Sequence, residues 1–557
     1  MSKDEDKNLK GKELAAKLEE IKLRGQEDHA KDISKTTGVP YVNLKVSPID
    51  TATIYMISEE DAHRGNIATF QRTGVTLKVA VEDPTNIEAK EILEGLKKRG
   101  YEIELYITSP LGLAWAWKKY EEKQEIEAKT LGRVDIEVEK MEAFQKEVEN
   151  FEELKKKLAG FSTTEMFGMV IAGALKMGAS DLHFEPEEKQ TRLRYRIDGV
   201  LQDVIDINPD NYKKLLSRIK LTSGLMINIT QAAQDGRFTI RLKEVDIEVR
   251  VSVLPGAYGE TIVMRILDPR SIKANIEELG FRPDVEALIK KQLDKSAGAV
   301  LMTGPTGSGK TTSLYAFLNY LNEEGIKIIT IENPIEYHIK GISQTQINKA
   351  KDYTFANGLR AIVRQDPDVI LVGEIRDRET AEIAMNASLT GHIVLSTLHT
   401  NDAAGSLPRL INLGVDPVII APAITTAMAQ RLVRKLCESC KVKSKVTGED
   451  LAKLREYLED LPPGIEPPEL NENIEIYYPK PEGCPECNGM GYKGRIAVLE
   501  VMLIDDEMEQ LILSRPAISE IKALAKKKGM TTLVQDGFMK VLDGVTSIEE
   551  VEWVIGY

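Results

Sequence analysis

The sequence predicts a multidomain α/β protein, and four observations support this fold class. The chain has 557 residues, which at ~150 residues per domain corresponds to three or four domains. An eight-residue glycine-rich motif, GPTGSGKT at 304–311, stands between an apolar run and a segment with helical spacing. Upstream, residues 75–98 and 162–268 mix alternating strand patterns with helical ones. A hydrophobic content of 42% supports folded domains rather than a disordered tether.

The glycine-rich motif fits the phosphate-binding pattern GxxxxGK[ST] at every position. The flanking residues 298–303 predict one buried strand and 312–321 predict a helix, which is the context that this motif requires. Glycines let backbone N–H groups turn toward phosphate oxygens. Lys310 is expected to reach the β- and γ-phosphates, and Thr311 to hold Mg²⁺. An ordinary glycine-rich turn is the alternative. The expected nucleotide contacts are Gly304, Pro305, Thr306, Gly307, Ser308, Gly309, Lys310, Thr311 and Thr312.

Composition limits the expected partners and location. The net charge is −14, so no overall field draws the chain to nucleic acid or to anionic lipid, and we expect no nucleic-acid partner. The first residues are charged and carry no apolar signal core, which predicts a cytoplasmic location. Residues 410–430 predict buried helix and turn rather than a membrane span. Membrane association is therefore expected only through partners.

Three segments precede the second large domain. Residues 1–36 are charged with helical spacing, which predicts either a solvated helix packed on its own domain or a docking helix for another protein. Residues 37–120 predict a small first α/β domain for partner docking, with strands at 41–44 and 75–81 and a helix at 87–98. Glutamate and lysine dominate 121–160, which predicts a helical linker.

Residues 161–270 predict a second α/β domain, with a helix over 166–177 and strands over 192–196 and 246–252. Turn signals occur at Asp198-Gly199 and Asp235-Gly236. Arginines are the chemically informative residues of this domain, because it leads directly into the phosphate-binding loop. Those on or beside predicted strands are Arg237, Arg250 and Arg265. Each is a candidate for completing the nucleotide site, and a surface ion pair is the alternative for each.

Residues 271–557 predict the nucleotide-binding domain. A strand over 326–331 leads into an acidic stretch that ends at Glu336, and another over 369–372 leads into Glu374. Acids at the carboxyl ends of parallel strands face the crevice where α/β sheets bind ligands. This placement suits a metal-bound water and a general base. His399 follows a third predicted strand and is a candidate sensor of the γ-phosphate, with a structural role as the alternative. Residues from 499 onward predict short helices.

All four cysteines occur in two CxxC motifs, and they are Cys437, Cys440, Cys484 and Cys487. In a chain expected to be cytoplasmic, this pattern favours thiolate ligands of one structural Zn²⁺ over disulfides. A redox CxxC motif is the alternative. The insert between the two motifs is longer than in a usual zinc ribbon, so we expect it to loop out of the element spanning 437–487.

The motifs together resemble the secretion superfamily ATPases of the type II secretion and type IV pilus assembly class. The resemblance rests on the phosphate loop, an acidic box at 331–337, the string RQDPDVILVGEIRD at 364–377 and a histidine box at 391–402. Upstream, GASDLHFEP at 178–186 and QDGRF at 234–238 are similar to the family's second N-terminal domain. The resemblance implies a RecA-like ATPase domain, a PAS-like second domain, a small first α/β domain and a zinc-binding insertion.

The resemblance also implies a function and roles for single residues. It implies ATP hydrolysis in a homohexameric ring that drives type IV pilus or type II secretion pseudopilus assembly through an inner-membrane platform protein, at the inner face of the cytoplasmic membrane. Glu336 and Glu374 would act at Mg²⁺ and the attacking water, His399 near the γ-phosphate, and Arg250, Arg265 and Arg237 would complete the site. The tetracysteine element and the first domain favour the assembly side over retraction.

Two departures from the family pattern stand out. The acidic box has Asn333 where Asp usually precedes the proline, which removes a charge beside the site. The N-terminal region lacks the Arg-Leu-Gly pattern that binds a cyclic dinucleotide in some relatives, so we expect no such regulation. The alternative functions are a nucleotide-gated scaffold with little turnover, a retraction-type pilus ATPase and, disfavoured by the acidic charge balance, a zinc-knuckle nucleic-acid motor.

Overall fold

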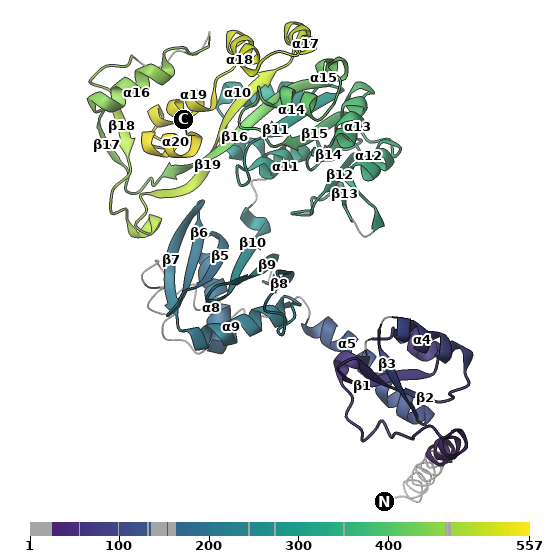
Figure 1. Ribbon diagram of the computed structural model, residues 1–557. Helices are drawn as coiled ribbons and strands as arrows, with labels where there is room; N and C mark the ends of the chain where they lie inside the picture. Colours follow the sequence, from purple (N-terminus) through teal and green to yellow (C-terminus); the bar gives the residue numbers. More distant parts are fainter. Residues whose placement is uncertain are drawn as a thin grey trace, which may run out of the picture. The chain divides into compact units, whose positions relative to one another are not determined.

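The computed structural model describes residues 25–54, 56–98, 100–130, 133–134, 153, 163–242, 245–271, 275–348, 351–462, 465 and 469–556. The chain divides into two compact units, Met1–Arg133 and Val134–Tyr557 (Figure 1). Of the predicted N-terminal segment, residues 25–36 are described, and they are helical. Most of the predicted linker at 121–160 lies outside the described residues. No helix among the described residues is long and apolar enough to cross a membrane.

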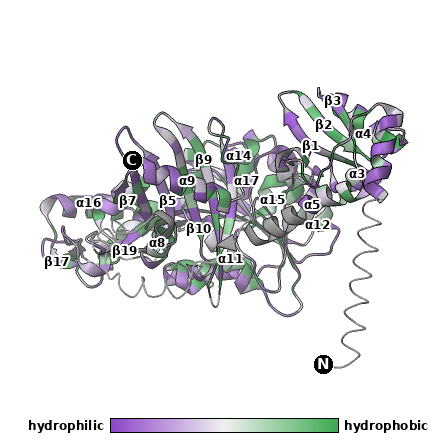
Figure 2. Ribbon diagram, turned by 90° about the horizontal axis from the view of Figure 1, so that it is seen from below, coloured by the Kyte–Doolittle hydropathy of each residue, from purple (hydrophilic) through white to green (hydrophobic). Residues whose placement is uncertain are grey.

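Unit 1 holds a three-stranded sheet in which β1 pairs with β2 antiparallel and β2 with β3 parallel. Its helices have one buried face, and hydrophobic and hydrophilic residues accordingly mix along α4 (Figure 2). The elements are α2 (Thr51–Ile54), α3 (Glu59–Arg64), β1 (Ile67–Thr73), β2 (Thr76–Val81), α4 (Ile87–Lys98), β3 (Glu102–Ile107) and α5 (Pro110–Thr130).

The strand predicted at 41–44 is wrong. Only Tyr41 forms a bridge, to Ile107, and the chain then turns. The Asn43 side chain accepts a hydrogen bond from the backbone N–H of Lys45 at 3.0 Å, which closes the turn. Short asparagine side chains compete for backbone groups in this way, and the competition ends the extended segment.

The second domain, in unit 2, is a sheet with strand order β4-β8-β9-β10-β5-β6-β7 and helices packed against its apolar face. The alternation along β6 leaves every second residue buried, as the sequence pattern predicts. The elements are β4 (Arg133–Val134), α8 (Thr163–Lys176), β5 (Ala179–Pro186), β6 (Thr191–Ile197), β7 (Val200–Ile207), α9 (Pro209–Thr222), β8 (Gln234–Arg241), β9 (Asp246–Gly256) and β10 (Gly259–Leu267).

The two turn signals of this domain have different outcomes. Asp198 and Gly199 both have positive φ, 49° and 89°, and join β6 to β7 as a tight hairpin turn. Asp235-Gly236 is not a turn, because both residues lie within β8. A Cβ at Gly236 would come within 2.3 Å of the Ser223 carbonyl oxygen. The glycine is there for close backbone approach, a use that a sequence pattern does not distinguish from a turn.

The nucleotide-binding domain is built on a sheet with strand order β13-β12-β14-β15-β11-β16-β19. All neighbours pair parallel except β16 and β19, which pair antiparallel. Apolar residues of α10 and α11 pack on one face, and those of α12, α13, α14 and α15 on the other. The elements that build the sheet and its flanks are η1 (Pro269–Ser271), η2 (Ile276–Leu279), α10 (Pro283–Leu293), β11 (Gly298–Thr303), α11 (Lys310–Leu321), β12 (Ile328–Glu332), β13 (Ser343–Gln346), α12 (Phe355–Val363), β14 (Val369–Val372), α13 (Arg378–Leu389), β15 (Ile393–Leu398), α14 (Ser406–Asn412), α15 (Pro417–Ala423) and β16 (Ile424–Leu436).

The rest of this domain is the insertion between the CxxC motifs and the C-terminal helices. A two-stranded antiparallel sheet of β17 and β18 belongs to the insertion, and the helix α16 lies between these strands in the sequence. The elements are β17 (Val442–Lys445), α16 (Gly448–Leu458), β18 (Glu475–Tyr478), η4 (Pro485–Cys487), β19 (Tyr492–Leu503), α17 (Asp506–Leu513), α18 (Ile518–Lys527), α19 (Leu533–Leu542) and α20 (Ile548–Ile555).

Two predictions for the end of the chain need correction. Residues 410–430 do not remain helix and turn, because β16 begins at Ile424. Residues from 499 onward are not only helices, because β19 runs to Leu503. Both stretches are strands buried on two faces, with few exposed positions. Such strands lack alternation, so periodicity alone does not separate them from buried helix.

Candidate functional site

The parallel sheet brings the predicted site residues to one edge. β11 and β15 are in register to their last residues, where Thr303 pairs with Leu398, and the phosphate loop and His399 follow directly. Neighbouring β14 ends at Val372, opposite Ile331 of β12. Glu374 and Glu336 therefore follow strands that end at this same edge. The edge is the position at which open α/β sheets bind ligands.

A cavity of about 800 Å³ occupies this edge. The nucleotide-binding domain supplies phosphate-loop residues together with Glu336, Glu374 and His399. The second domain supplies Asp181, Arg196 and Arg265, among others. The volume lies within the ~300–1,000 Å³ typical of ligand pockets. Most predicted site residues thus meet in one space between two domains of unit 2.

The phosphate loop is preformed. Gly307 and Gly309 adopt φ of 81° and 82°, which side-chain-bearing residues rarely reach. Lys310 Nζ donates to the carbonyl oxygens of Gly304 and Pro305, at 2.8 and 3.0 Å. Burial lowers the pKa of Lys310, and nearby Arg431 adds to this effect. Ser308 Oγ is buried without a hydrogen-bond partner. The loop therefore holds donors that an anionic ligand would satisfy.

Gln430 supports the phosphate loop through two hydrogen bonds, and no sequence pattern predicted this role. Its Nε2 donates to the Ser308 carbonyl oxygen at 2.8 Å, and its Oε1 accepts from Ser313 Oγ at 2.7 Å. The side chain is 1% exposed and spans both ends of the turn from loop to helix. A Cβ at Gly309 would approach Gln430 Nε2 to 2.8 Å. One glutamine in a buried strand gave no sequence signal of this contact.

The acidic box contains two glutamates with different surroundings. Glu332 is 4% exposed and accepts hydrogen bonds from Tyr315, Thr330 and Gln344. Within the described part of the chain, the Glu336 carboxylate has no hydrogen-bond partner, and it lines the cavity. Burial raises the pKa of Glu336, although the guanidinium groups of Arg250 and Arg265 pull it down. Glu332 is therefore fixed by its partners, and Glu336 is the carboxylate that can take up a proton.

Glu374 lies between the side chains of Arg376 and His399. Its Oε2 is 2.6 Å from Arg376 Nε and 3.4 Å from His399 Nε2. The Glu374 side chain is 13% exposed, whereas Arg376 and His399 face the open cavity. The structure thus brings the two predicted residues Glu374 and His399 together, with Arg376 as a partner that the sequence did not single out.

Magnesium would fit beside the loop. The Thr311 hydroxyl and the Glu374 carboxylate line the same cavity and are oxygen donors, the ligand type that Mg²⁺ prefers. Asn333 also lines the cavity, but a neutral amide adds no charge for a cation.

The three predicted arginines lie in one row across the second domain. Arg237 on β8 pairs with Arg250 on β9, which pairs with Arg265 on β10. The row continues to Asp181 on β5 and Arg196 on β6. Cross-strand pairs share a face of the sheet, so these charges stand side by side on the polar face.

The members of this row differ in how far they reach into the site. Arg265 lines the cavity, and its Nε donates to Asp181 Oδ1 at 2.8 Å. Hydrogen bonding to Asp181 raises the pKa of Arg265. Arg250 Nη2 donates to the Ile335 carbonyl oxygen at 3.0 Å, next to Glu336. Arg237 is exposed and does not line the cavity. Asp181, 5% exposed, orients Arg265 and was missed by sequence reasoning.

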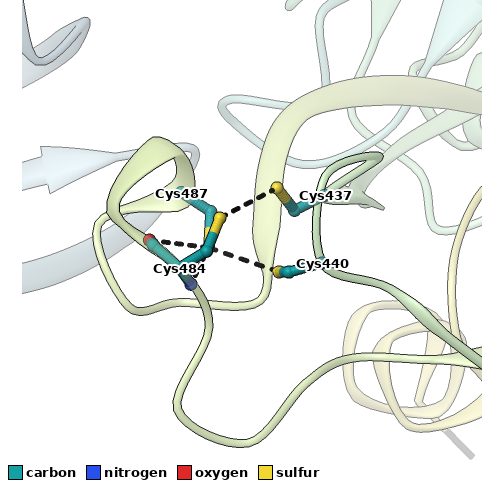
Figure 3. A group of neighbouring side chains, drawn as sticks. All are labelled: Cys437, Cys440, Cys484 and Cys487. Atoms are coloured by element: carbon teal, nitrogen blue, oxygen red, sulfur yellow. Dashed lines mark hydrogen bonds between the residues drawn. The ribbon is translucent and has the colours of Figure 1, made fainter.

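The four cysteines meet at the end of the β16–β19 ribbon, and their sulfurs point toward one another (Figure 3). All four Sγ atoms lie within 4.8 Å of one another, with Cys437–Cys484 and Cys440–Cys487 both at 3.8 Å, and no disulfide joins them. A tetrahedral Zn²⁺ with ~2.3 Å Zn–S bonds spaces its sulfurs about 3.8 Å apart. The cluster therefore fits one structural zinc ion.

Local hydrogen bonds prepare Cys487 for a metal. The backbone N–H groups of Cys484 and Gly491 donate to Cys487 Sγ at 3.1 and 3.2 Å. Burial works against ionisation, but these hydrogen bonds lower the pKa of Cys487 to about 7. Metal ions bind the thiolate form of cysteine. This sulfur is consequently well prepared to be a ligand near neutral pH.

Comparison with known proteins agrees with this geometry. The profile of the family described as "Type II/IV secretion system protein" matches residues 161–553, and that of the "MshEN domain" matches 37–127. The chain is 39% identical to the type IV pilus assembly ATPase PilB of Myxococcus xanthus over 93% of this chain and 89% of the relative. It is 43% identical to type II secretion system protein E of Pseudomonas aeruginosa over 69% of this chain and 74% of the relative. The ATPase DotB of Legionella pneumophila shares the fold at 20% identity, with a TM-score of 0.51 over 71% of this chain and 95% of that one.

The fold and the phosphate loop define the chain as a P-loop ATPase. More narrowly, it belongs to the type II/IV secretion system protein family. The family and the α/β fold class predicted from the motifs are therefore confirmed.

We expect purified protein to contain one zinc ion per chain, because four thiolates complete one tetrahedral shell. Cys487→Ser should abolish stoichiometric zinc and lower the midpoint of thermal unfolding by about 5 °C or more. Elemental analysis and calorimetry measure the two effects. Ser444→Ala, an exposed change on β17 in the insertion between the two CxxC motifs, is the matched control and should retain zinc. A folded wild-type protein without zinc in reductant would exclude the assignment.

Proposed function

We propose that this chain is a cytoplasmic ATP-hydrolysing motor that powers assembly of a type IV pilus. The observation that carries the proposal is the cavity itself, where a complete phosphate loop, two carboxylates, a histidine and arginines of a second domain surround one space. A scaffold with little turnover would need the phosphate loop, but it would not need a carboxylate without hydrogen-bond partners beside that loop. Glu336 therefore favours the hydrolysing alternative over the nucleotide-gated scaffold.

The extent of similarity favours pilus assembly over type II secretion. The match to the pilus assembly ATPase spans 93% of the chain, whereas the match to the type II secretion protein spans 69%. Type II pseudopilus assembly is the second candidate, because the type II secretion protein is 43% identical over the 69% of the chain that it matches. The tetracysteine element of this chain and its N-terminal α/β domain support assembly over retraction.

The proposed roles follow from the positions in the cavity. Lys310 leaves its own loop carbonyls to neutralise the β- and γ-phosphates, while the loop N–H groups hold the remaining oxygens. Thr311 and Glu374 would hold Mg²⁺, which supplies charge neutralisation at the phosphates when bound. Glu336 takes the proton of the attacking water, and His399 donates toward the γ-phosphate.

The second domain completes the charge stabilisation. Asp181 uses one oxygen to hold Arg265 through Nε, so both Nη groups of Arg265 are without partners among the described residues. Arg250 holds the backbone beside Glu336 through the Ile335 carbonyl. Positive charge placed where negative charge develops accelerates phosphoryl transfer. Closing of this domain on the phosphate loop would thereby couple hydrolysis to domain motion. Arg237 would contribute at longer range.

The assembly and its location extend the proposal beyond one chain. We infer a homohexameric ring that acts on an inner-membrane platform protein from the cytoplasmic face, with membrane contact only through partners. The same proposal includes partner docking by the first N-terminal domain, and it includes no role for nucleic acid. Gel filtration with light scattering in the presence of Mg²⁺-ATP measures the ring.

The ATPase proposal is tested by steady-state phosphate release. Lys310→Ala should reduce turnover by about 100-fold or more and weaken nucleotide binding, because its charge neutralises the transferred phosphate. Lys295→Ala, an exposed lysine outside the cavity, is the matched control and should leave turnover unchanged. Equal turnover in the two variants would show that the ATPase activity does not depend on this phosphate loop.

A pH profile tests the role of Glu336. Arg250→Gln removes a positive charge that lowers the pKa of Glu336, so this pKa rises further. Glu336 must be deprotonated to accept a proton, and the acid limb of kcat/KM should therefore move to higher pH. Arg237→Gln, one strand farther along the row, should move it less. An unmoved limb in Arg250→Gln would exclude Glu336 as the titrating base.

The closing of the second domain is tested at Arg265. Arg265→Ala should retain ATP binding and lose turnover by ~10³-fold, because the guanidinium acts on charge that develops during transfer. Arg270→Ala, which breaks an exposed pair with Asp268 at 2.7 Å, is the matched control. Rings that mix wild-type and Arg265→Ala subunits should lose activity more steeply than in proportion. Near-normal turnover in Arg265→Ala would show that Arg265 is only a surface ion-pair partner and does not complete the nucleotide site.

A further inference from the structure

Glu500 is a buried carboxylate to which the proposed mechanism gives no role. It lies on β19, opposite Ala429 of β16, and is 4% exposed. Burial raises the pKa of Glu500, whereas hydrogen bonds from backbone N–H groups favour its charged form. A buried carboxylate destabilises a fold unless its oxygens are paired. The partners of these two oxygens therefore indicate what the residue does.

The two oxygens of Glu500 join segments that are far apart in the sequence. Oε1 accepts a hydrogen bond from the backbone N–H of Ala403 at 2.9 Å, and Oε2 accepts one from the backbone N–H of Leu533 at 3.4 Å. Leu533 is the first residue of α19, which packs against β19 (Figure 1). Negative charge is favourable at the N-terminus of a helix. Because Ala403 follows His399 by four residues, Glu500 connects the chain beyond His399 to the C-terminal helices.

Glu500 belongs to a group of side chains that hold residues 399–405, which we call the histidine loop. Each contact fixes a different residue of the loop. The contacts are Thr303 Oγ1 with the Thr400 N–H at 2.8 Å, Arg431 Nη2 with the Asn401 carbonyl oxygen at 2.9 Å, Lys522 Nζ with the Asp402 carboxylate at 2.7 Å and Glu500 Oε1 with the Ala403 N–H at 2.9 Å. The histidine loop is thereby restrained at every residue from Thr400 to Ala403.

His399 depends on this loop for its position, because its own side chain has little support. The side chain is 49% exposed, and within the described part of the chain its hydrogen-bond partner is Glu374, at 3.4 Å. The backbone on either side, β15 before it and the histidine loop after it, therefore sets where the imidazole lies. A displacement of about 1 Å at a catalytic group can reduce a rate by ~100-fold.

Glu500 separates this positioning effect from nucleotide binding. Thr303 directly precedes the phosphate loop, and Arg431 lies close enough to Lys310 to lower its pKa. A change at Thr303 or Arg431 would therefore also disturb phosphate binding. Glu500 does not line the cavity. Its connection to the nucleotide site is the histidine loop alone.

We propose that Glu500 is a positioning residue for His399. Its carboxylate ties the backbone at Ala403 to the N-terminus of α19, and this restraint holds the imidazole where it can donate toward the γ-phosphate. The inference rests on the proposed role of His399 in ATP hydrolysis, and it adds the group that orients this histidine. It also gives the C-terminal helices a part in the site, because α19 supplies the other end of the restraint.

Loss of one hydrogen bond tests this role without changing the shape of the side chain. Glu500→Gln keeps one acceptor oxygen, but its NH2 group faces a backbone N–H, so one of the two restraints is lost. We expect kcat for phosphate release to fall by about tenfold, while the affinity for Mg²⁺-ATP in calorimetry stays unchanged. In the His399→Ala background the same substitution should cause no further fall in kcat, because the group that it positions is absent.

Asp536→Asn is the matched control for the loss of a buried carboxylate. Asp536 is 1% exposed and, like Glu500, accepts a hydrogen bond from a backbone N–H, that of Leu499 on β19, at 2.9 Å. Among the described residues, its hydrogen bonds and ion pairs do not include the histidine loop. Asp536→Asn should therefore lower the midpoint of thermal unfolding and keep kcat at a temperature at which the variant is folded.

Lys522→Ala tests the same loop from the protein surface. The Lys522 side chain is 45% exposed, so this variant should fold even where Glu500→Gln does not. Loss of the pair with Asp402, next to Ala403, should lower kcat by less than Glu500→Gln does, because an exposed ion pair restrains a loop less than a buried hydrogen bond. This fall should again require His399.

The outcomes separate the positioning role from the function on which it rests. An equal fall in kcat for Glu500→Gln with and without His399 would overturn the positioning role and leave the ATPase proposal intact. Unchanged kcat in Glu500→Gln, or in Lys522→Ala should Glu500→Gln not fold, would have the same meaning. Wild-type turnover in His399→Ala would overturn the proposed role of His399 itself. A wild type that releases no phosphate would overturn the ATPase proposal.

Discussion

The parallel pairing of β11 with β15 is the constraint on which the site depends. Because the two strands end in register at Thr303 and Leu398, the phosphate loop and His399 leave the sheet at the same level. The pairing of β14 with β15 then places Glu374 within reach of His399, at 3.4 Å. A shift of one residue in either pairing would exchange the side chains between the two buried faces of the sheet and separate these groups. The geometry of the cavity edge thus depends on strand register before it depends on any loop.

The strand β16 connects the phosphate loop to the rest of the domain. Its Gln430 holds the phosphate loop, and its Leu432 lines the cavity. The guanidinium group of its Arg434 lies against the ring of Trp553, and the first CxxC motif follows its last residue. The antiparallel partner β19 begins just after the second CxxC motif. Zinc at this position would hold together the open end of the β16–β19 ribbon, and it would thereby stabilise the strand that supports the loop.

How far the sequence predicts this site depends on how local each signal is. The phosphate loop and the CxxC pairs are local patterns with fixed chemistry, and the strand at 298–303 and the helix at 87–98 have the predicted bounds. Gln430 and Asp181 act through contacts between segments far apart in the sequence, which no periodicity encodes. Gly236 was predicted wrongly for a related reason. In a sequence, a glycine required for close packing cannot be distinguished from a glycine required for a turn. Strands buried on both faces, such as β16, lose the alternation that would identify them.

Electrostatics explains why a nucleotide would close the proposed motor. The second domain presents Arg250 and Arg265 toward an edge that also contains Lys310 and Arg376. Asp181, Glu336 and Glu374 lie among these cations and offset much of their charge. A triphosphate bound between Arg265 and Lys310, one from each domain, would add negative charge that attracts both cations, and this attraction would stabilise the closed state. Loss of the γ-phosphate removes part of the negative charge, so the closed state loses stabilisation as hydrolysis proceeds. Since a ligand shifts a conformational equilibrium only by its differential affinity for the two states, this difference in charge is the source of the work that the domain can deliver.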